Sequence, residues 1–521
     1  MKKMKKEKKK KKSVGAGSLA LVLLALIPVV LWPGDVSWLI DESRIIANAW
    51  HANHDGQFAA GGLYGNFGIR YGPLPTQIYQ ALLLLTHDPA TLVVLRGLLA
   101  AGMTGGALLW LARTLALPAW FAAAVLVSPH VVAYHRILWD ASFAMPIGAL
   151  AFAAFADFLK TQRSRSLRVC VIATAVLPLI HPQALALAVP VFGWLGWRHR
   201  AEVWRDWRAL AVLGVVFGAL HAAYLFEVAG QLFARFSGSV ERGYPGGASR
   251  TMSALAPLLG GRLLCGADYL ESLARPAAFP ALQAAAQWSA RLIYPLIWLG
   301  IALSAGRAWR MICEVRRARG SWENIPFRDR VSAVALAGLI GQALLCGLMR
   351  IPALPQYFFG TFVLHALMAW FAVEALSRWR AGVLPGVLYA AGGAVLTMSA
   401  MLVIHDHGFE KPRWPTLGND VEVVRELNRF TDTTVQTDVT VLQKNPQILR
   451  TLRLLLPPAP GAAQTENGWL CIDYRGMSPA GRIQLSWLQV VPGESYHPLP
   501  RHEPLDVTPL PKNWVPDAKT W

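Results

Sequence analysis

Apolar runs long enough to cross a bilayer recur over the first 404 residues of this chain. A run of roughly 18 to 25 apolar residues spans the ~30 Å hydrocarbon core as a helix, which satisfies its own backbone hydrogen bonds there. The composition agrees, because 54% of the 521 residues are hydrophobic, 16% are charged, and the mean hydropathy is +0.36. The sequence therefore predicts an all-α polytopic membrane protein.

Hydropathy and the positions of Lys and Arg predict about 11 transmembrane helices. Two short predicted spans meet at His181-Pro182, which predicts a bent or re-entrant pair supported by protein or by a water-filled cavity. The predicted spans are residues 17–34, 90–112, 115–129, 141–159, 168–180, 182–197, 209–229, 289–309, 331–349, 357–377 and 383–404.

The distribution of basic residues predicts the orientation. A Lys-rich segment, residues 1–16, precedes the first span and is expected to be a cytoplasmic tail behind an uncleaved anchor. With the N-terminus inside, the connections richest in Lys and Arg also fall inside, so the net charge of +19 reports topology rather than nucleic-acid binding. The expected location is a bacterial inner membrane, with residues 17–404 as the transmembrane domain and external loops at 35–89, 129–140 and 230–288.

Residues 405–521 differ in character from the rest of the chain. A helical segment near 419–430 is followed by alternating segments at 433–442, 468–474 and 482–491, which are typical of strands. This pattern predicts a small C-terminal α/β domain outside the membrane, in the periplasm. The five cysteines are scattered without metal-like spacing, so the sequence indicates no disulfide framework, no metal site and no certain cofactor, although it leaves a divalent ion open.

The first external loop is dense in groups that could carry chemistry. Residues Asp41 to Trp50 have helical spacing and could lie along the membrane surface, with Asp41 at the helix start. A carboxylate there could act as a general base toward a hydroxyl. The alternative is helix capping, in which Asp41 accepts backbone N–H bonds and Glu42 favours the positive end of the helix dipole. Asp35, closer to the first span, is a rival for the base.

The second external connection, residues 129–140, places His135 and Arg136 among aromatic residues. Arg136 could hold a phosphate by forked hydrogen bonds, with His135 assisting. The alternative is an aromatic belt at the membrane interface with Arg136 extending to the headgroups. Arg350, at the outer end of the ninth predicted span, is a further candidate of the same kind.

Four features together resemble the GT-C class of membrane glycosyltransferases, in particular the bacterial relatives of protein O-mannosyltransferases and of lipid A aminoarabinose transferases. They are a Lys-anchored first span, the acidic pair Asp41-Glu42, the segment Tyr71-Gly-Pro-Leu-Pro75, and the later Arg136-x-x-Trp-Asp-x-Ser142. The match covers about residues 30–145. Beyond it the resemblance rests on topology, and the C-terminal domain matches no acceptor-binding module.

The resemblance implies inverting transfer of a sugar from a polyprenyl-phosphate carrier to a protein, lipid or glycan acceptor on the external face. In such enzymes the acidic residue of the first loop acts as base or orients the acceptor, a role that maps onto Asp41 with Glu42 beside it. Basic residues hold the donor phosphate, and no metal is required. The residues expected to bind substrate are Arg44, Arg70, Tyr71, His135, Arg136, Asp140, Arg350 and Tyr357.

Two other functions fit an apolar chain of this kind. A sugar-lipid or lipid transporter would carry polar residues at mid-membrane depth in several spans and paired broken helices, of which the sequence offers one candidate break. A non-catalytic assembly scaffold would use its outer domain to bind partners and would bind no donor.

Overall fold

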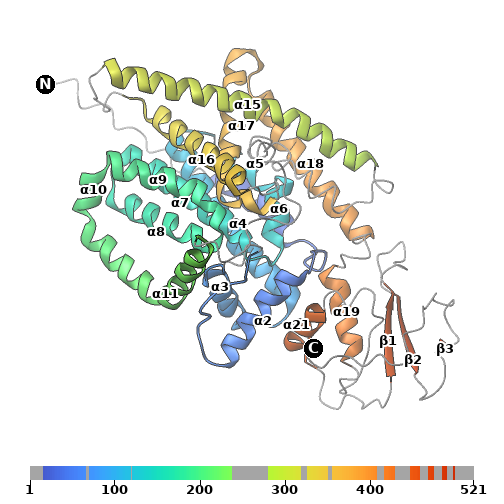
Figure 1. Cartoon of the computed structure of the whole chain (residues 1–521). Coiled ribbons are helices and arrows are strands. Elements are labelled where there is room, and N and C mark those ends of the chain that lie inside the picture. Colours follow the sequence, from blue (N-terminus) through green and yellow to red (C-terminus); the bar gives the residue numbers. More distant parts are fainter. Residues whose placement is uncertain are drawn as a thin grey trace.

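The computed structural model of the protein describes residues 16–65, 70–118, 120–236, 280–317, 325–349, 355–407, 416–428, 446–457, 468–473, 484–489 and 497–498. Within them the chain is mostly helical (Figure 1). Predictions for residues 1–15, most of the 230–288 loop, Arg350, the strand at 433–442 and the end of the chain fall outside the described residues.

The N-terminal half consists of helices joined by short connections. Its helices are α1 (Ala16–Val30), α2 (Ile40–His54), α3 (Leu74–Leu83), α4 (Pro89–Leu115), α5 (Trp120–Leu126), α6 (Pro129–Arg136), α7 (Ala144–Thr161), α8 (Ser164–Ile180), α9 (Leu185–Arg198), α10 (Arg200–Arg205) and α11 (Trp207–Phe236), with short 3-10 turns η1 (Ala141–Phe143) and η2 (Pro182–Ala184).

The second half begins with long helices and ends in a small sheet. Its elements are α15 (Pro280–Arg317), α16 (Phe327–Met349), the 3-10 turn η4 (Pro355–Thr361), α17 (Phe362–Leu376), a π-helical turn η5 (Ser377–Ala381), α18 (Leu384–His407), α19 (Leu417–Leu427), α21 (Pro446–Leu455), β1 (Gly468–Asp473), β2 (Gln484–Gln489) and β3 (His497–Pro498).

Among the described residues, seven helical segments are long and apolar enough to cross a membrane, which makes the chain a multi-pass membrane protein. They are Pro89–Leu115, Ala141–Thr161, Trp207–Gln231, Pro280–Arg317, Phe327–Gly347, Gln356–Trp379 and Leu384–His405. The four other predicted spans fall on the shorter helices α1, α5, α8 and α9. The total of eleven spans therefore stays a prediction.

The predicted break between the two short spans is present. His181 has an extended backbone (φ −152°, ψ 123°), and η2 begins at the following proline. A residue before proline is pushed out of the helical region, and proline itself lacks the N–H that would continue the ladder. The chain therefore stops α8 at Ile180 and restarts as α9 after one 3-10 turn.

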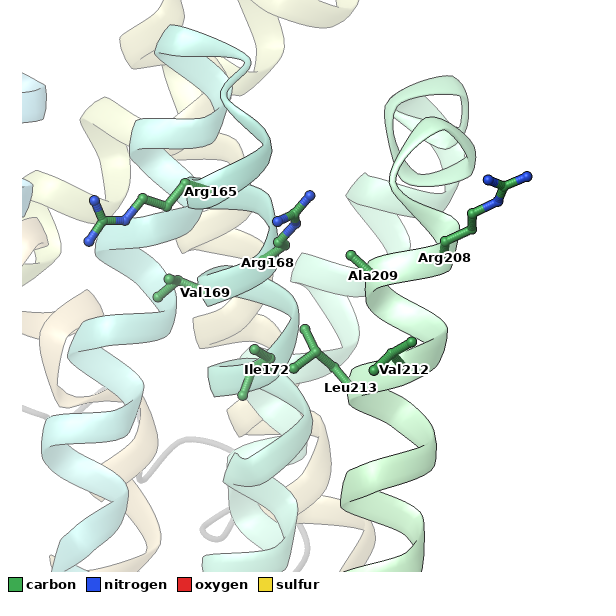
Figure 2. Close-up of a pocket in the computed structure, with 8 residues that line it drawn as sticks. All are labelled: Arg165, Arg168, Val169, Ile172, Arg208, Ala209, Val212 and Leu213. Atoms are coloured by element: carbon green, nitrogen blue, oxygen red, sulfur yellow. The ribbon is translucent and has the colours of Figure 1, made fainter.

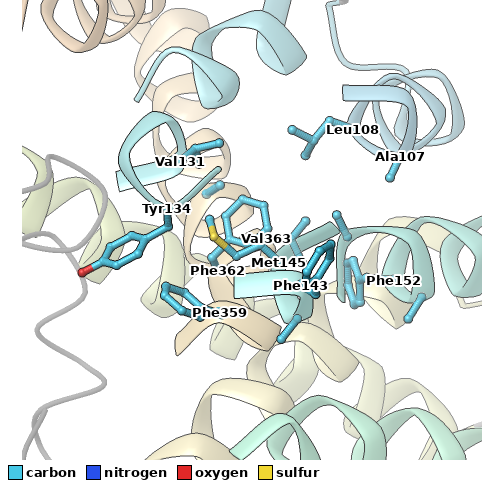
Figure 3. Close-up of a cluster of buried hydrophobic side chains, with 14 of the residues drawn as sticks. Ala107, Leu108, Val131, Tyr134, Phe143, Met145, Phe152, Phe359, Phe362 and Val363 are labelled. Carbon is cyan, nitrogen blue, oxygen red and sulfur yellow. The ribbon is translucent and has the colours of Figure 1, made fainter. Parts of the chain in front are cut away.

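Helices α7 and α17 form the centre of the bundle and are largely buried, whereas α11 and α15 expose most of their apolar surface. Figure 3 shows Phe143, Phe152, Phe359 and Phe362 meeting in this core, with the hydroxyl of Tyr134 directed away from it. Small residues permit the close contacts. A Cβ at Gly300 of α15 would lie 1.9 Å from the carbonyl oxygen of Met368 in α17, so only glycine fits.

Two C-terminal helices pack against the first loop. The backbone N–H of Leu417 donates to Val36 O (2.8 Å), and the Thr451 hydroxyl of α21 donates to Ser43 O in α2 (3.1 Å). Figure 1 shows α2, α21 and α19 side by side at one end of the bundle, with the strands beyond α19. The antiparallel strands β1 and β2 lie within the predicted ranges 468–474 and 482–491, while a separate C-terminal α/β domain stays a prediction.

Candidate functional site

Helix α2 carries the acidic pair and has the predicted amphipathic pattern. Ile45, Ile46 and Ala49 are fully buried, while Arg44 is exposed. The cap differs from the expected one, because Leu39 is the N-cap residue and its N–H donates to Glu42 Oε2 (3.1 Å). The prediction that Asp41 would cap the helix is wrong, since capping falls to the side chain three residues after the cap, as in one half of a capping box.

Asp41 lies at the second position of α2, where it is half-buried. Burial raises the pKa of this carboxyl, whereas the charge of Arg44 and a hydrogen bond with the Trp139 side chain lower that pKa. The Trp139 indole has only an N–H to offer, so it donates to Asp41. The hydrogen bond joins the loop after α1 to the segment that precedes α7.

Two further carboxyl groups lie close to Asp41 and are almost completely buried. Burial raises the pKa of Glu42 to about 8, its backbone hydrogen bonds oppose the rise, and the charges of Asp41 and Asp140 add to it. Burial likewise raises the pKa of Asp140 to about 7, against a 2.7 Å hydrogen bond from the Ala141 N–H. The second carboxyl oxygen of Asp140, Oδ2, has no hydrogen-bond partner in the described structure.

Carboxyl groups this close cannot all be ionised at once, because like charges in a buried site repel. Glu42, with a pKa of about 8, is mostly protonated at pH 7, whereas Asp140, with a pKa of about 7, holds its proton only in part. Asp41 has more solvent contact and a cation one turn along its helix, and both favour its ionised form.

Two tyrosines approach the same carboxyl groups from other elements. Burial raises the pKa of Tyr71, and the charges of Asp140, Tyr357 and Asp41 raise it further, which shows that these groups are neighbours. The His181 ring is a neighbour of both tyrosines, with centroids 5.2 Å from Tyr71 and 5.7 Å from Tyr357. The break between α8 and α9 thus brings a buried histidine to the site.

A close backbone contact positions Tyr71. The Gly72 N–H donates to Leu179 O in α8 (2.5 Å), and a Cβ at Gly72 would lie 2.4 Å from that oxygen. The glycine of the Tyr-Gly-Pro-Leu-Pro segment is therefore required for the loop to lie against α8. The segment then enters α3, as the two prolines predict.

Arg70 is held by protein groups near the C-terminal end of α11. Its guanidinium forms an ion pair with Glu227 (Nη1 to Oε2, 2.9 Å) and donates to Gly62 O (3.2 Å). The Tyr64 ring lies 5.6 Å from the guanidinium carbon. Arg70 therefore fixes the chain directly before Tyr71, and its side chain stays partly exposed.

His135 and Arg136 are buried, so the prediction of an aromatic belt with Arg136 at the headgroups is wrong. Arg136 Nη2 donates to the carbonyls of Leu31 (2.8 Å) and Trp32 (2.7 Å), which follow α1. The His135 ring nitrogens lie 2.7 Å from Val131 O and 2.8 Å from the Thr104 hydroxyl. Tertiary packing places both side chains against neighbouring helices, where backbone acceptors bind them.

The rival base Asp35 lies outside the carboxyl cluster, which consists of Asp41, Glu42 and Asp140. Its Oδ2 is 2.8 Å from His405 Nδ1 at the end of α18, and the His405 ring stacks on Trp32 with a centroid distance of 4.3 Å. The structure therefore places Asp35 in a contact between the first loop and the last long helix. Arg350 falls outside the described residues.

The sequence prediction missed Arg96, a fully buried residue of α4. Its guanidinium donates to the carbonyls of Tyr134 (2.9 Å) and His135 (2.6 Å) and to the Ser142 hydroxyl. It holds the end of α6 and the start of α7, and so the position of Trp139 and Asp140. An arginine inside an apolar run was the signal, since charged groups within spans are rare and usually have a specific role.

No protein-family model and no curated protein sequence matches the chain significantly. The crystal structure of ArnT from Cupriavidus metallidurans in the apo state matches it with a TM-score of 0.52 and 16% identity, over 88% of this chain and 93% of that one. A crystal structure of ArnT from the same organism, bound to undecaprenyl phosphate, covers the same shares at 16% identity with a TM-score of 0.40. The apo match confirms the GT-C resemblance at the level of the fold.

Proposed function

We propose that the chain is an inverting glycosyltransferase, which transfers a sugar from a polyprenyl-phosphate carrier to an acceptor on the external face of a bacterial inner membrane. The proposal is supported by the shared fold with ArnT, a GT-C glycosyltransferase, and by the multi-pass architecture. The observation that carries it is the placement of Asp41, a half-buried carboxyl group beside the buried carboxyl groups of Glu42 and Asp140.

Asp41 is the proposed base. It accepts the proton of the attacking hydroxyl as the acceptor oxygen forms its bond to the anomeric carbon. The bond between that carbon and the phosphate oxygen breaks on the opposite side, and the polyprenyl phosphate leaves with the bonding electron pair. While Glu42 and Asp140 hold their protons, they add no negative charge near the departing phosphate, which full ionisation of the cluster would repel.

The other residues that were expected to bind substrate are given different roles according to their contacts. Arg44 is exposed one turn from Asp41 and is the proposed partner of the donor phosphate, together with Arg350. Tyr71 and Tyr357 are the proposed wall for the sugar, since both rings contact His181 and Tyr71 is a neighbour of Asp41 and Asp140.

Three predicted ligands are proposed to position the site. Arg70 anchors the chain before Tyr71 through Glu227, while His135 and Arg136 join α6 to α4 and to the end of α1. The contacts of His135 and Arg136 hold the segment that leads into Trp139 and Asp140.

The test is sugar transfer by purified full-length protein in detergent. The donors are a panel of undecaprenyl-phosphate sugars, and the readout is released undecaprenyl phosphate. Asp41→Asn is expected to lower kcat roughly 10²- to 10⁴-fold, the usual loss when a general base is removed. Asp55→Asn, at the exposed C-terminal end of the same helix, is the matched control and should retain activity.

Full activity of Asp41→Asn would remove this residue from the mechanism. A transporter releases no carrier in detergent, where no membrane separates two sides, so the absence of turnover with every donor would contradict the transferase. Mass spectrometry of envelope glycans and lipids after deletion of the gene would identify the sugar and the acceptor.

A further inference from the structure

A groove of about 710 Å³ lies between α8 and α11, away from the carboxyl cluster. Figure 2 shows apolar side chains along it, including Ile172, Val212 and Leu213, and three arginines near one end, Arg165, Arg168 and Arg208, of which Arg165 and Arg208 point away from each other. Val212 is 63% exposed and Ile172 39% exposed. The walls thus offer apolar surface that no described part of the chain covers.

The arginine end of the groove has an excess of positive charge. Arg168 is neutralised by Asp206, whose two carboxyl oxygens accept from Nε (2.7 Å) and Nη2 (2.6 Å). Arg165 and Arg208 are exposed, and the stretch from Arg163 to Arg208 contains seven arginines but only two carboxylates. Arg165 and Arg208 lie outside the Asp206 pair, and as exposed side chains they can turn toward an anion at this end.

Exposed tryptophans place this end at the level of the lipid headgroups. Trp197, Trp204 and Trp207 are 61%, 70% and 50% exposed, and they lie in or beside α10, which connects α9 to α11. Tryptophan is enriched where the hydrocarbon meets the headgroups, and basic residues are enriched on the cytoplasmic side. The groove therefore runs from the headgroup level into the apolar layer.

We propose that this groove binds an anionic glycerophospholipid of the adjoining leaflet. The exposed side chains of Arg165 and Arg208 turn toward the headgroup phosphate, and an acyl chain lies against Ile172 and Val212. The two features required of such a ligand, one negative charge and a long apolar tail, match the two parts of the groove. The lipid site is separate from the carboxyl cluster, because Arg165 and His181 are 16 residues apart along α8, about 24 Å of helix.

The test is native mass spectrometry of the purified full chain, titrated with phosphatidylglycerol and, separately, with phosphatidylcholine of the same acyl chains. The unmodified protein is expected to retain one phosphatidylglycerol in preference to phosphatidylcholine. Each arginine near the headgroups contributes about a factor of five in affinity, so R165Q/R208Q should bind this lipid ~30-fold more weakly.

Two further variants separate the groove from general surface charge. R316Q/R317Q removes two exposed arginines from the last turn of α15 and should bind phosphatidylglycerol like the unmodified protein. Val212→Trp fills the groove without changing the charge and should lower affinity for both lipids. Because Val212 is exposed, its replacement should leave the bundle folded.

Three results would overturn the proposal. They are undiminished phosphatidylglycerol binding by R165Q/R208Q, an equal loss in R316Q/R317Q, and equal affinity of the unmodified protein for the two lipids. Displacement of bound phosphatidylglycerol by equimolar undecaprenyl phosphate would assign the groove to the carrier instead and would also refute it.

Discussion

Replacement of Glu42 by glutamine should make the protein more stable, and by an amount that grows with pH. The glutamine amide keeps an oxygen that can accept the Leu39 N–H, so the helix cap survives, but the group no longer titrates. Burial raises the pKa of Glu42 from its ordinary 4.5 to about 8 in the folded state. A carboxyl group whose pKa is raised in the folded state does not change the unfolding free energy below its unfolded pKa. Above that pH it lowers the unfolding free energy, and the loss grows until the pH passes the folded pKa.

The expected size follows from that shift. Each pKa unit corresponds to about 1.4 kcal/mol, so between pH 5 and pH 8 the unmodified protein should lose roughly 3 to 4 kcal/mol of unfolding free energy relative to Glu42→Gln. Above pH 8 the difference should level off, because Glu42 is then ionised in both states. Below pH 4.5 it should vanish.

The assay is thermal unfolding of both proteins in the same detergent, followed by intrinsic fluorescence at intervals from pH 4.5 to 8.5. Asp55→Asn, at the exposed end of α2, is the matched control, for which no comparable pH-dependent gain is expected. A difference between Glu42→Gln and the unmodified protein that stays constant across this range would refute the claim that Glu42 is buried as a neutral acid.

Two other substitutions test the assignment of the site. Asp35→Asn should keep transfer activity within about threefold of the unmodified protein, because Asp35 contacts His405 outside the carboxyl cluster. A loss of roughly 10²-fold or more, as large as a general base contributes, would instead make Asp35 the base. Arg96→Met should lower the unfolding free energy by about 2 to 4 kcal/mol, because it leaves buried carbonyls at the end of α6 without a donor. Thermal unfolding measures the change, with replacement of the exposed Arg113 by methionine as the control. An unfolding temperature equal in these two variants would contradict the role given to Arg96.

The sequence was informative wherever a local pattern has a direct physical cause. Apolar length and basic ends predicted helices at all eleven ranges, since a bilayer permits few alternatives. The amphipathic spacing predicted α2, and Pro182 predicted the break after α8. The resemblance in fold could also be predicted, because its motif residues lie together within about residues 30–145.

Tertiary structure decided which charged groups are available for chemistry. Nothing local distinguishes the buried Arg136, bound to carbonyls after α1, from the exposed Arg44. Asp35 meets a histidine 370 residues away, which removes it from the cluster that it adjoins in sequence.

The protonation of Asp41 and Glu42 could not be predicted from the sequence either. A carboxyl group's pKa depends on burial and on neighbouring charge, and for Glu42 part of that charge comes from Asp140, almost 100 residues later. The sequence thus determined the helices and the positions of the acidic residues along them, and packing between distant helices determined which of these carboxyl groups are buried.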